Sequence, residues 1–268
     1  MDIYLITILI GIVLTLIVFF NFYSKYNKES NIIFYNNEET KQFLQNDEDK
    51  YISRLTKYDL IARKSKDHKS YILNISECAT SFTNIQKQKV KNCADKADQF
   101  LSKFKWNGLE CSAISKISWK FALTSRVNHF EYEDGLPHTR KDIIFLTENT
   151  LNSNEHHLIN ILIHEKIHIF QRMNRTIMKN MVQEMGFVVF TQTPQHTVKL
   201  RRSNPDINDQ IYYDTNSGSV YFCKYSSENP SNISDVDLNY VSTEHPYEKM
   251  AYEIAGEYTR QIMNEKKI

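Results

Sequence analysis

Apolar residues along this chain recur with two periods, which predict helices in some stretches and short strands in others. Through residues 81–104 they return every three or four positions, as on one face of an amphipathic helix. The same spacing over 38–64 predicts one or two further helices, and an almost uniformly apolar stretch over 154–173 predicts a buried helix. Pro246, favourable in a first helical turn, begins a closing helix that we expect to reach about residue 263.

Short apolar or alternating runs between turn residues predict strands in two groups. One group lies on either side of the Asp134-Gly135 turn, and the other follows Met185. The predicted strands cover 117–123, 142–146, 187–191, 197–200, 211–213 and 220–222. Helices followed by strands around one buried helix predict an α+β fold with a small mixed sheet, because a regular βαβ array would alternate throughout.

The N-terminal segment over residues 3–23 is apolar and carries no charge. About 20 apolar residues at 1.5 Å each are long enough to cross a hydrocarbon core of about 30 Å. Asp2 stands where a signal peptide has basic residues, and aromatic residues up to Tyr23 stand where a cleavage site needs small ones. The segment predicts an uncleaved transmembrane helix over 1–24 and a single-pass membrane protein of a virion or host membrane, held in the membrane through residues 3–23.

The side of the membrane stays open in this interpretation. Lys25 and Lys28 after the span favour a cytoplasmic body, because positive charges collect on that side. Sequons at Asn74, Asn174 and Asn232 would suit a lumenal or extracellular body instead. The four cysteines contain no CxxC pair, so they permit two disulfides without requiring them.

Composition narrows the function classes. The chain has 268 residues, a formal net charge of +1 and 41% hydrophobic residues, which excludes wholesale disorder. The balanced charge argues against a dedicated nucleic-acid binder, so we expect no nucleic-acid partner. We expect a tether and helical region over 25–109 and one domain over 110–268. The oligomeric state stays open.

The predicted buried helix contains the motif His164-Glu165-Lys166-Ile167-His168, an H-E-x-x-H pattern. Four helical positions advance the chain by about 400°, so the two imidazoles lie on one face. Both can then reach one Zn²⁺ at about 2.0–2.1 Å, while Glu165 beside them can act as the general base for water. Polar groups in an otherwise apolar run would cost several kcal/mol without partners, which a bound metal explains.

This motif, in a helix that follows the strand over 142–146, resembles that of the zincin metallopeptidases. The gluzincin pattern, E-x-x-A/S-D on a later helix, is matched here by Glu248-Lys249-Met250-Ala251-Tyr252, with Tyr in place of Asp. The resemblance implies that Glu248 is the third zinc ligand. Four longer stretches of the chain, all within residues 110–260, look like those of zincin-type metallopeptidases encoded by large DNA viruses. They are GLPHTRKDIIFLT, LIHEKIHIFQR, RRSNPDIND and EHPYEKMAYEIA.

Two neighbours compete with Glu248 for the third ligand position. Glu244 precedes Pro246 and so falls just outside the predicted helix, and Glu253 lies about 140° from Glu248 around the helix. His245 is a candidate catalytic residue that would donate a hydrogen bond to a tetrahedral oxyanion, with helix capping and packing as the alternative.

Two further polar residues, His138 and Arg140, follow the Asp134-Gly135 turn. They either lie on an edge strand that binds extended substrate or simply reflect loop polarity.

Together these features predict a membrane-anchored, zinc-dependent metallopeptidase that cleaves a peptide or protein substrate. In this hypothesis His164, His168 and Glu248 hold zinc, and Glu165 and His245 are catalytic. One alternative is a catalytically silent structural or interaction protein of a virion or membrane that keeps the zincin fold. The other is that HEKIH is a coincidental helix face.

Overall fold

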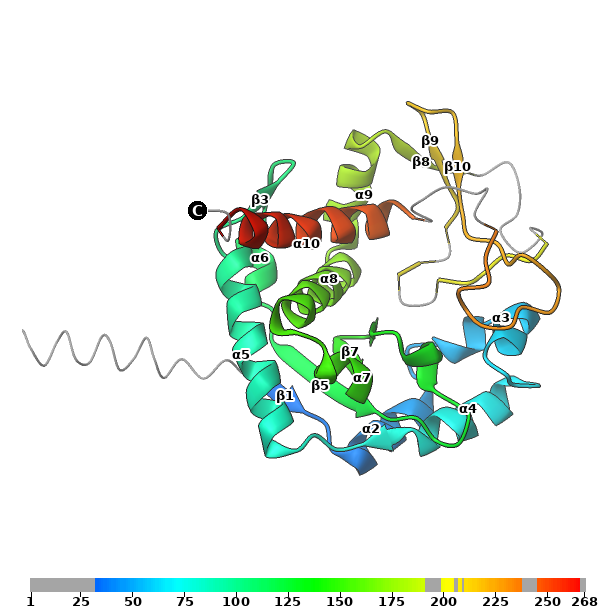
Figure 1. The fold of residues 1–268 in the computed structure, drawn as a ribbon. Coiled ribbons are helices and arrows are strands. Elements are labelled where there is room, and N and C mark those ends of the chain that lie inside the picture. The colour runs from blue at the N-terminus through cyan, green and yellow to red at the C-terminus, as the bar shows by residue number, and fades with distance from the viewer. Residues whose placement is uncertain (1–31, 191–198, 205–206, 209, 238–244, 266–268) are drawn as a thin grey trace, which may run out of the picture. The chain divides into compact units, whose positions relative to one another are not determined.

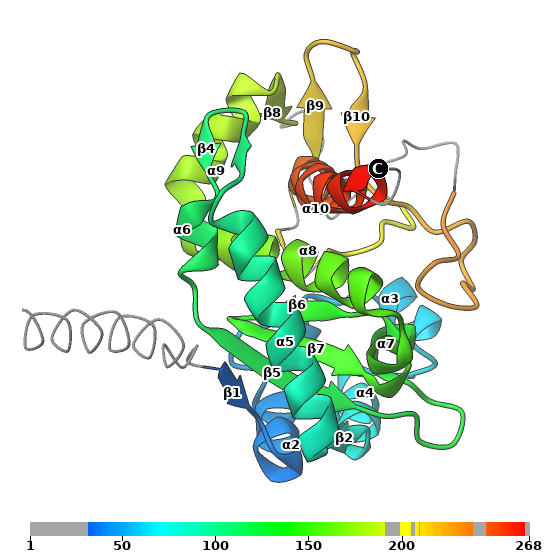
Figure 2. The ribbon, with the colours of Figure 1, turned by 60° about the vertical axis from the view of Figure 1, so that its left-hand side comes forward.

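A five-stranded mixed sheet supports the part of the chain that contains the H-E-x-x-H motif (Figures 1 and 2). The computed structural model describes residues 32–190, 199–204, 207–208, 210–237 and 245–265. The sheet order is β1-β5-β7-β6, with β2 also paired to β5. Its strands are β1 (Ile32–Phe34), β2 (Ala79–Thr80), β5 (Trp119–Thr124), β6 (His138–Arg140) and β7 (Ile143–Thr147).

The two central strands β5 and β7 run parallel, with Phe121 opposite Ile144. Strand β6 returns antiparallel to β7 and forms one edge. Every residue of β7 is buried, because helices cover both faces of the sheet, and the strand therefore reads as a continuous apolar run. Successive side chains point to opposite faces, so β7 supplies residues to two separate cores.

The first of these cores lies between the sheet and the helices of the N-terminal half. Ala122, Ile143 and Phe145 pack there against Leu44 and Tyr71. The covering elements are α2 (Asn37–Asn46), η1 (Ile52–Arg54), α3 (Lys57–Ala62) and α4 (His68–Glu77). Each of the three α-helices begins with a complete capping box, which satisfies backbone N–H groups of its first turn.

The opposite face of the sheet carries α5 (Asn84–Leu101) and α8 (Glu155–Met173), which lie side by side in Figure 2. Asn154 caps α8 by accepting a hydrogen bond from the backbone N–H of His157. Lys166, inside the motif, is fully buried and donates to Asp98 Oδ1 of α5 at 2.5 Å. Its ammonium also lies 3.9 Å from the Trp119 ring centroid, so this residue joins α8 to α5 and to β5.

The C-terminal part adds α9 (Arg175–Glu184), a small antiparallel sheet and α10 (Pro246–Glu265), which crosses α8 in Figure 1. Ala251 and Ala255 are buried on α10, and such small side chains let two helices approach closely. Asn160 of α8 donates to the Ala255 carbonyl at 2.6 Å, which fixes the crossing point. The small sheet has the order β10-β9-β8, with β8 (Phe187–Val189), β9 (Tyr212–Asp214) and β10 (Val220–Tyr221).

Short elements connect these layers. They are β3 (Lys105–Trp106), β4 (Leu109–Glu110), α6 (Ser112–Ser115), η2 (Tyr132–Gly135) and α7 (Glu148–Asn152). Residues Ile33–Ile268 cluster as one compact unit. Strands from before and after residue 110 share the main sheet, and the predicted domain boundary there stays a prediction.

The α+β class is confirmed, as are the buried helix, the closing helix and both central strands. Helices α4 and α9 were not predicted, because each presents only a few buried apolar positions. The predicted strand over 197–200 lies partly outside the described residues, and Lys199 and Leu200 form a turn. The predicted strand over 187–191 is shorter, because β8 ends at Val189.

The predicted transmembrane helix requires a correction. In the ranges that the structure describes, no helix is long and apolar enough to cross a membrane. The segment over residues 3–23, on which the prediction rested, lies outside the described residues. The described residues form an α+β fold in which no helix could span a membrane, and we withdraw the assignment as a single-pass membrane protein.

Candidate metal centre

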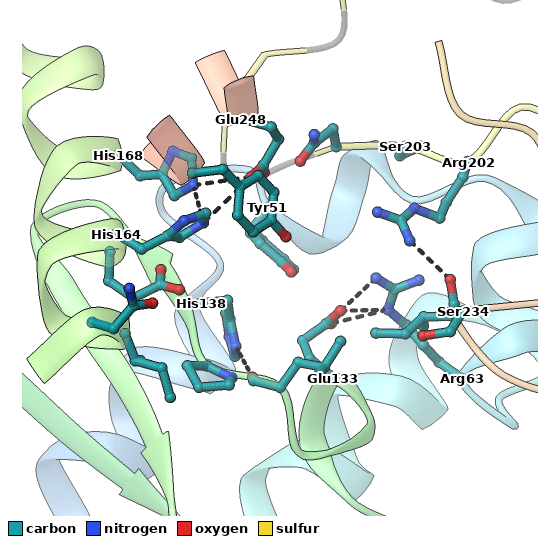
Figure 3. Close-up of a pocket in the computed structure, with 18 of the residues that line it drawn as sticks. Tyr51, Arg63, Glu133, His138, His164, His168, Arg202, Ser203, Ser234 and Glu248 are labelled. Carbon is teal, nitrogen blue, oxygen red and sulfur yellow. Dashed lines mark hydrogen bonds and ion pairs between the residues drawn. The ribbon is translucent and has the colours of Figure 1, made fainter. Parts of the chain in front are cut away.

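Three side chains from two helices converge at the crossing of α8 and α10 (Figure 3). His164 and His168 come from successive turns of α8, and their Nε2 atoms are 2.9 Å apart. Glu248 comes from the first turn of α10, and its Oε2 lies 3.3 Å from His164 Nε2 and 3.5 Å from His168 Nε2. All three side chains are largely buried, so the cluster has little contact with bulk water.

These distances fit a tetrahedral metal ion. Tetrahedral ligands about 2.0–2.1 Å from Zn²⁺ are roughly 3.3 Å from one another. The three donor atoms here are separated by 2.9, 3.3 and 3.5 Å. Two imidazole nitrogens and one carboxylate oxygen are also a donor set that catalytic zinc sites use, with a fourth position left for water or substrate.

Gln171 orients one of the candidate ligands. Its Oε1 lies 2.8 Å from His168 Nδ1, so that nitrogen donates its proton and leaves Nε2 as a lone-pair donor facing Glu248. The Gln171 amide in turn donates to the Tyr247 carbonyl on α10 at 3.0 Å. Gln171 is buried and lies three positions after His168, a spacing that could have identified it in the sequence.

The charge of Glu248 is set by two opposing effects. Burial alone would raise its pKa, but the adjacent His168 and His164 rings lower the pKa of Glu248 well below its usual value. The carboxylate is therefore ionised and faces two imidazoles. Among the described residues only those two rings lie within ion-pair distance of its carboxylate, and no Lys or Arg does.

Of the two alternative third ligands, the structure describes one. Glu253 points away from the cluster, and its Oε2 accepts a hydrogen bond from the Trp106 indole at 3.0 Å. Glu244 lies outside the described residues. Of the described acidic side chains, only Glu248 lies with the two histidines in a group that could hold a metal ion.

Glu165 is buried and lines the same cavity as His164, His168 and Glu248, but it is not part of the candidate ligand cluster. The position next to His164 turns its side chain by about 100° from the two imidazoles. The description of the site as an H-E-x-x-H centre is corrected accordingly: the group that could hold a metal ion is the His164, His168 and Glu248 triad, and the motif supplies only two of its members.

His245 has its ring nitrogens engaged at the start of α10. Its Nδ1 accepts a hydrogen bond from the Tyr247 N–H at 3.1 Å, and its Nε2 donates to Asn208 Oδ1 at 3.0 Å. Burial lowers the pKa of His245 to about 3, so the ring is neutral. Within the described chain it does not line the cavity of the triad, and its catalytic role stays a prediction.

His138 and Arg140 both lie on the edge strand β6, in different surroundings. His138 stacks on Phe145 and lines the cavity of the triad. Arg140 is buried and pairs with Asp49 Oδ1 at 2.5 Å and with Asp47 Oδ1 at 3.0 Å, so its charge serves to hold the N-terminal half against the sheet.

The cavity around the triad has a volume of about 520 Å³. Opposite the triad in Figure 3 lies a second buried charged group, in which Arg63, the residue after α3, donates a hydrogen bond to Glu133 of η2. Tyr252 lines the opening and its ring lies 4.7 Å from that of His164, a contact that the sequence alone did not indicate. The cavity therefore brings together residues from both halves of the chain.

Comparison with known proteins assigns no family to this chain. No protein-family model matches the chain, and neither a curated protein nor a solved structure does.

Proposed function

We propose that this chain is a zinc-dependent metallopeptidase, with the metal held by His164, His168 and Glu248. The observation that carries the proposal is the mutual separation of the three donor atoms, 2.9–3.5 Å, at one end of an open cavity. The resemblance of the HEKIH helix and of the Glu248 segment to zincins supports the same proposal independently of these distances.

Each residue then has a defined task. When bound, Zn²⁺ would polarise the scissile carbonyl and lower the pKa of the attacking water. Glu165 lines the cavity next to the triad, where its carboxylate can accept the proton of that water and deliver it to the leaving amine. Gln171 keeps His168 in the tautomer that presents Nε2 to the site.

Burial of Glu165 favours this role. The residue is 5% exposed, so bulk water has little access to its carboxylate. The cavity is also large enough for several residues of a peptide, whose extended chain advances about 3.3 Å per residue.

The test separates metal binding from chemistry. We expect the full chain to contain about one zinc and to cleave members of a diverse peptide library. Glu165→Gln should keep the zinc and lose at least about 100-fold in rate, since general-base catalysis contributes about 10²–10⁴-fold. Glu148→Gln, an exposed glutamate on α7, is the matched control and should keep both.

Two results would contradict the proposal. Bound zinc without turnover of any peptide would favour the alternative, a silent structural or interaction protein. An unchanged rate in Glu165→Gln would show that a contaminating activity or another site cleaves the peptides.

A further inference from the structure

A second cavity continues along α8 beyond the triad. It has a volume of about 760 Å³, and His168 lines both this cavity and the one around the triad. The first cavity lies along the N-terminal part of α8, from His157 to His168, and the second begins at His168 and follows Gln171 and Arg172. We call the second one the basic cavity.

Four positively charged side chains line the basic cavity, from three separate elements. Arg54 comes from η1, Arg172 from α8, and Arg175 and Lys179 from α9. Among the described lining residues there is no Asp or Glu. Like charges in one concave surface repel each other and focus a positive potential into it, which attracts anions.

Arg175 and Lys179 are two exposed positive charges on α9 that line the basic cavity. They are exposed, lie four positions apart on one face of α9 and form no ion pair with an acidic side chain among the described residues. A like-charged pair at this spacing destabilises a helix by a few tenths of a kcal/mol. Both charges line a cavity that further positive side chains also line, and this position favours a ligand of opposite charge.

A smaller adjoining cavity extends the same surface. Its volume is about 240 Å³, and it shares Arg54, Arg172 and Arg175 with the basic cavity. The acidic residue in its described lining is Asp49, which is already paired with Arg140 at 2.5 Å. That carboxylate is therefore neutralised inside the protein and does not cancel the charge of the surface.

The other walls of the basic cavity are apolar. Phe187, Val188 and Val189 of the edge strand β8 line it, and the two valines are about 40% exposed. Positive charge beside a partly exposed apolar edge strand suits an extended peptide with acidic side chains. A nucleic-acid strand would need exposed rings on which its bases could stack, whereas the aromatic residues in the described lining, Phe187, Tyr212 and Tyr247, are buried.

We propose that the basic cavity binds carboxylate groups of the substrate on one side of the scissile bond; this rests on the proposed peptidase function. Arg172 lies four positions after His168, about 6 Å along the helix axis. An extended peptide advances about 3.3 Å per residue, so the acidic residues should lie within about two to four residues of the scissile bond.

The experiment measures binding without turnover. Zinc-loaded Glu165→Gln protein is titrated into labelled, C-terminally amidated peptides that carry three Glu residues on one side or the other of a central apolar pair, or three Gln residues there. We expect the Glu peptide of one orientation to bind at least about 10-fold more tightly than its Gln counterpart. Added Arg175→Gln and Lys179→Gln substitutions should reduce this ratio to below about 2.

A matched variant controls for net charge. Lys91→Gln and Lys116→Gln remove two exposed positive charges from α5 and from the end of α6, and they should leave the ratio unchanged. Equal binding of Glu and Gln peptides would overturn the proposal if peptides with a free C-terminus also bind no more tightly than amidated ones, and so would an equal loss in this control. Tighter binding of a single-stranded oligonucleotide of the same charge would overturn it in favour of nucleic acid.

Two further measurements are needed. One shows whether the bound carboxylate is a Glu side chain or the C-terminus, and the other separates the proposed anion site from the proposed peptidase function. Peptides with a free C-terminus and no Glu should bind tightly only if the cavity takes a terminal carboxylate, and either source supports the proposal. Acid-dependent binding by a protein that cleaves no peptide would remove the proposed peptidase function and leave the anion site. Peptide cleavage without any preference for acidic residues would remove the anion site and leave the proposed peptidase function.

Discussion

Two buried clusters of ionisable side chains lie on opposite sides of one cavity, and they differ in where their positive charge comes from (Figure 3). In the Arg63–Glu133 cluster the chain supplies both charges: Arg63 Nε lies 2.9 Å from Glu133 Oε1, and Tyr71 donates to the same carboxylate. In the triad, Glu248 faces two imidazoles, and no Lys or Arg among the described residues pairs with it.

The difference teaches how to tell a structural cluster from a binding site. A buried carboxylate needs a countercharge, since an unpaired buried ion costs several kcal/mol. The Arg63–Glu133 cluster contains its own countercharge, so it is a structural ion pair that lines the cavity. The triad offers three donors at metal-ligand spacing, and an external cation is the partner that fits them.

The largest expected effect tests the triad itself. Glu248→Ala should weaken zinc binding by about 1,000-fold, or about 4 kcal/mol, because structural zinc sites bind with roughly 10–16 kcal/mol shared among a few ligands. Competition titration against a chelator measures this affinity. Glu253→Ala on the same helix is the matched control; it removes a bond to Trp106 and should keep wild-type affinity. The reverse order of affinities would move the third ligand to Glu253.

The next effect concerns the stability contributed by the Arg63–Glu133 cluster. Burial alone would raise the pKa of Glu133, but Arg63, with smaller contributions from His138 and Tyr71, lowers it to about 2 from a usual 4.5. Because the folded pKa is the lower one, the stabilisation of about 3 kcal/mol is present above about pH 4.5 and is lost as the pH falls toward 2. Glu133→Gln should therefore lower the free energy of unfolding by about 3 kcal/mol at pH 7 and by less at pH 3, as urea titrations would measure.

Two controls sharpen the contrast between the clusters. Glu77→Gln breaks the exposed pair with Lys41 and should change stability by less than about 1 kcal/mol at either pH. Glu133→Gln should leave the zinc affinity of the folded protein unchanged. A large loss of zinc in that variant would mean that the two clusters are coupled, against the distinction drawn between them.

The smallest expected effect tests the orientation of His168. Gln171→Ala removes the acceptor of its Nδ1 proton and should weaken zinc binding about 10–100-fold, as loss of such partners does in other metal sites. Gln171→Glu keeps an acceptor at this position and should recover most of the affinity. If both variants bound zinc like the wild type, Gln171 would serve only to join α8 to α10.

The sequence by itself determined the local features of this protein. The HEKIH motif, its position in a buried helix and the shared face of His164 and His168 follow from helical periodicity, which acts over a few residues. The strands at β5 and β7 and the start of α10 at Pro246 were also readable, because burial on both faces and turn residues leave local signals. The membrane-spanning helix, read from composition alone, is the prediction that was withdrawn.

Only the tertiary structure decided which distant residues meet. Glu248 reaches the two histidines because α10 crosses α8 at Ala251 and Ala255, and no local pattern specifies that crossing. The pairing of Arg63 with Glu133 and the gathering of positive charges from η1, α8 and α9 likewise join segments far apart in the chain. Such contacts depend on how helices pack on a sheet, and packing is set by the whole core, whereas periodicity reports only on a few neighbouring residues.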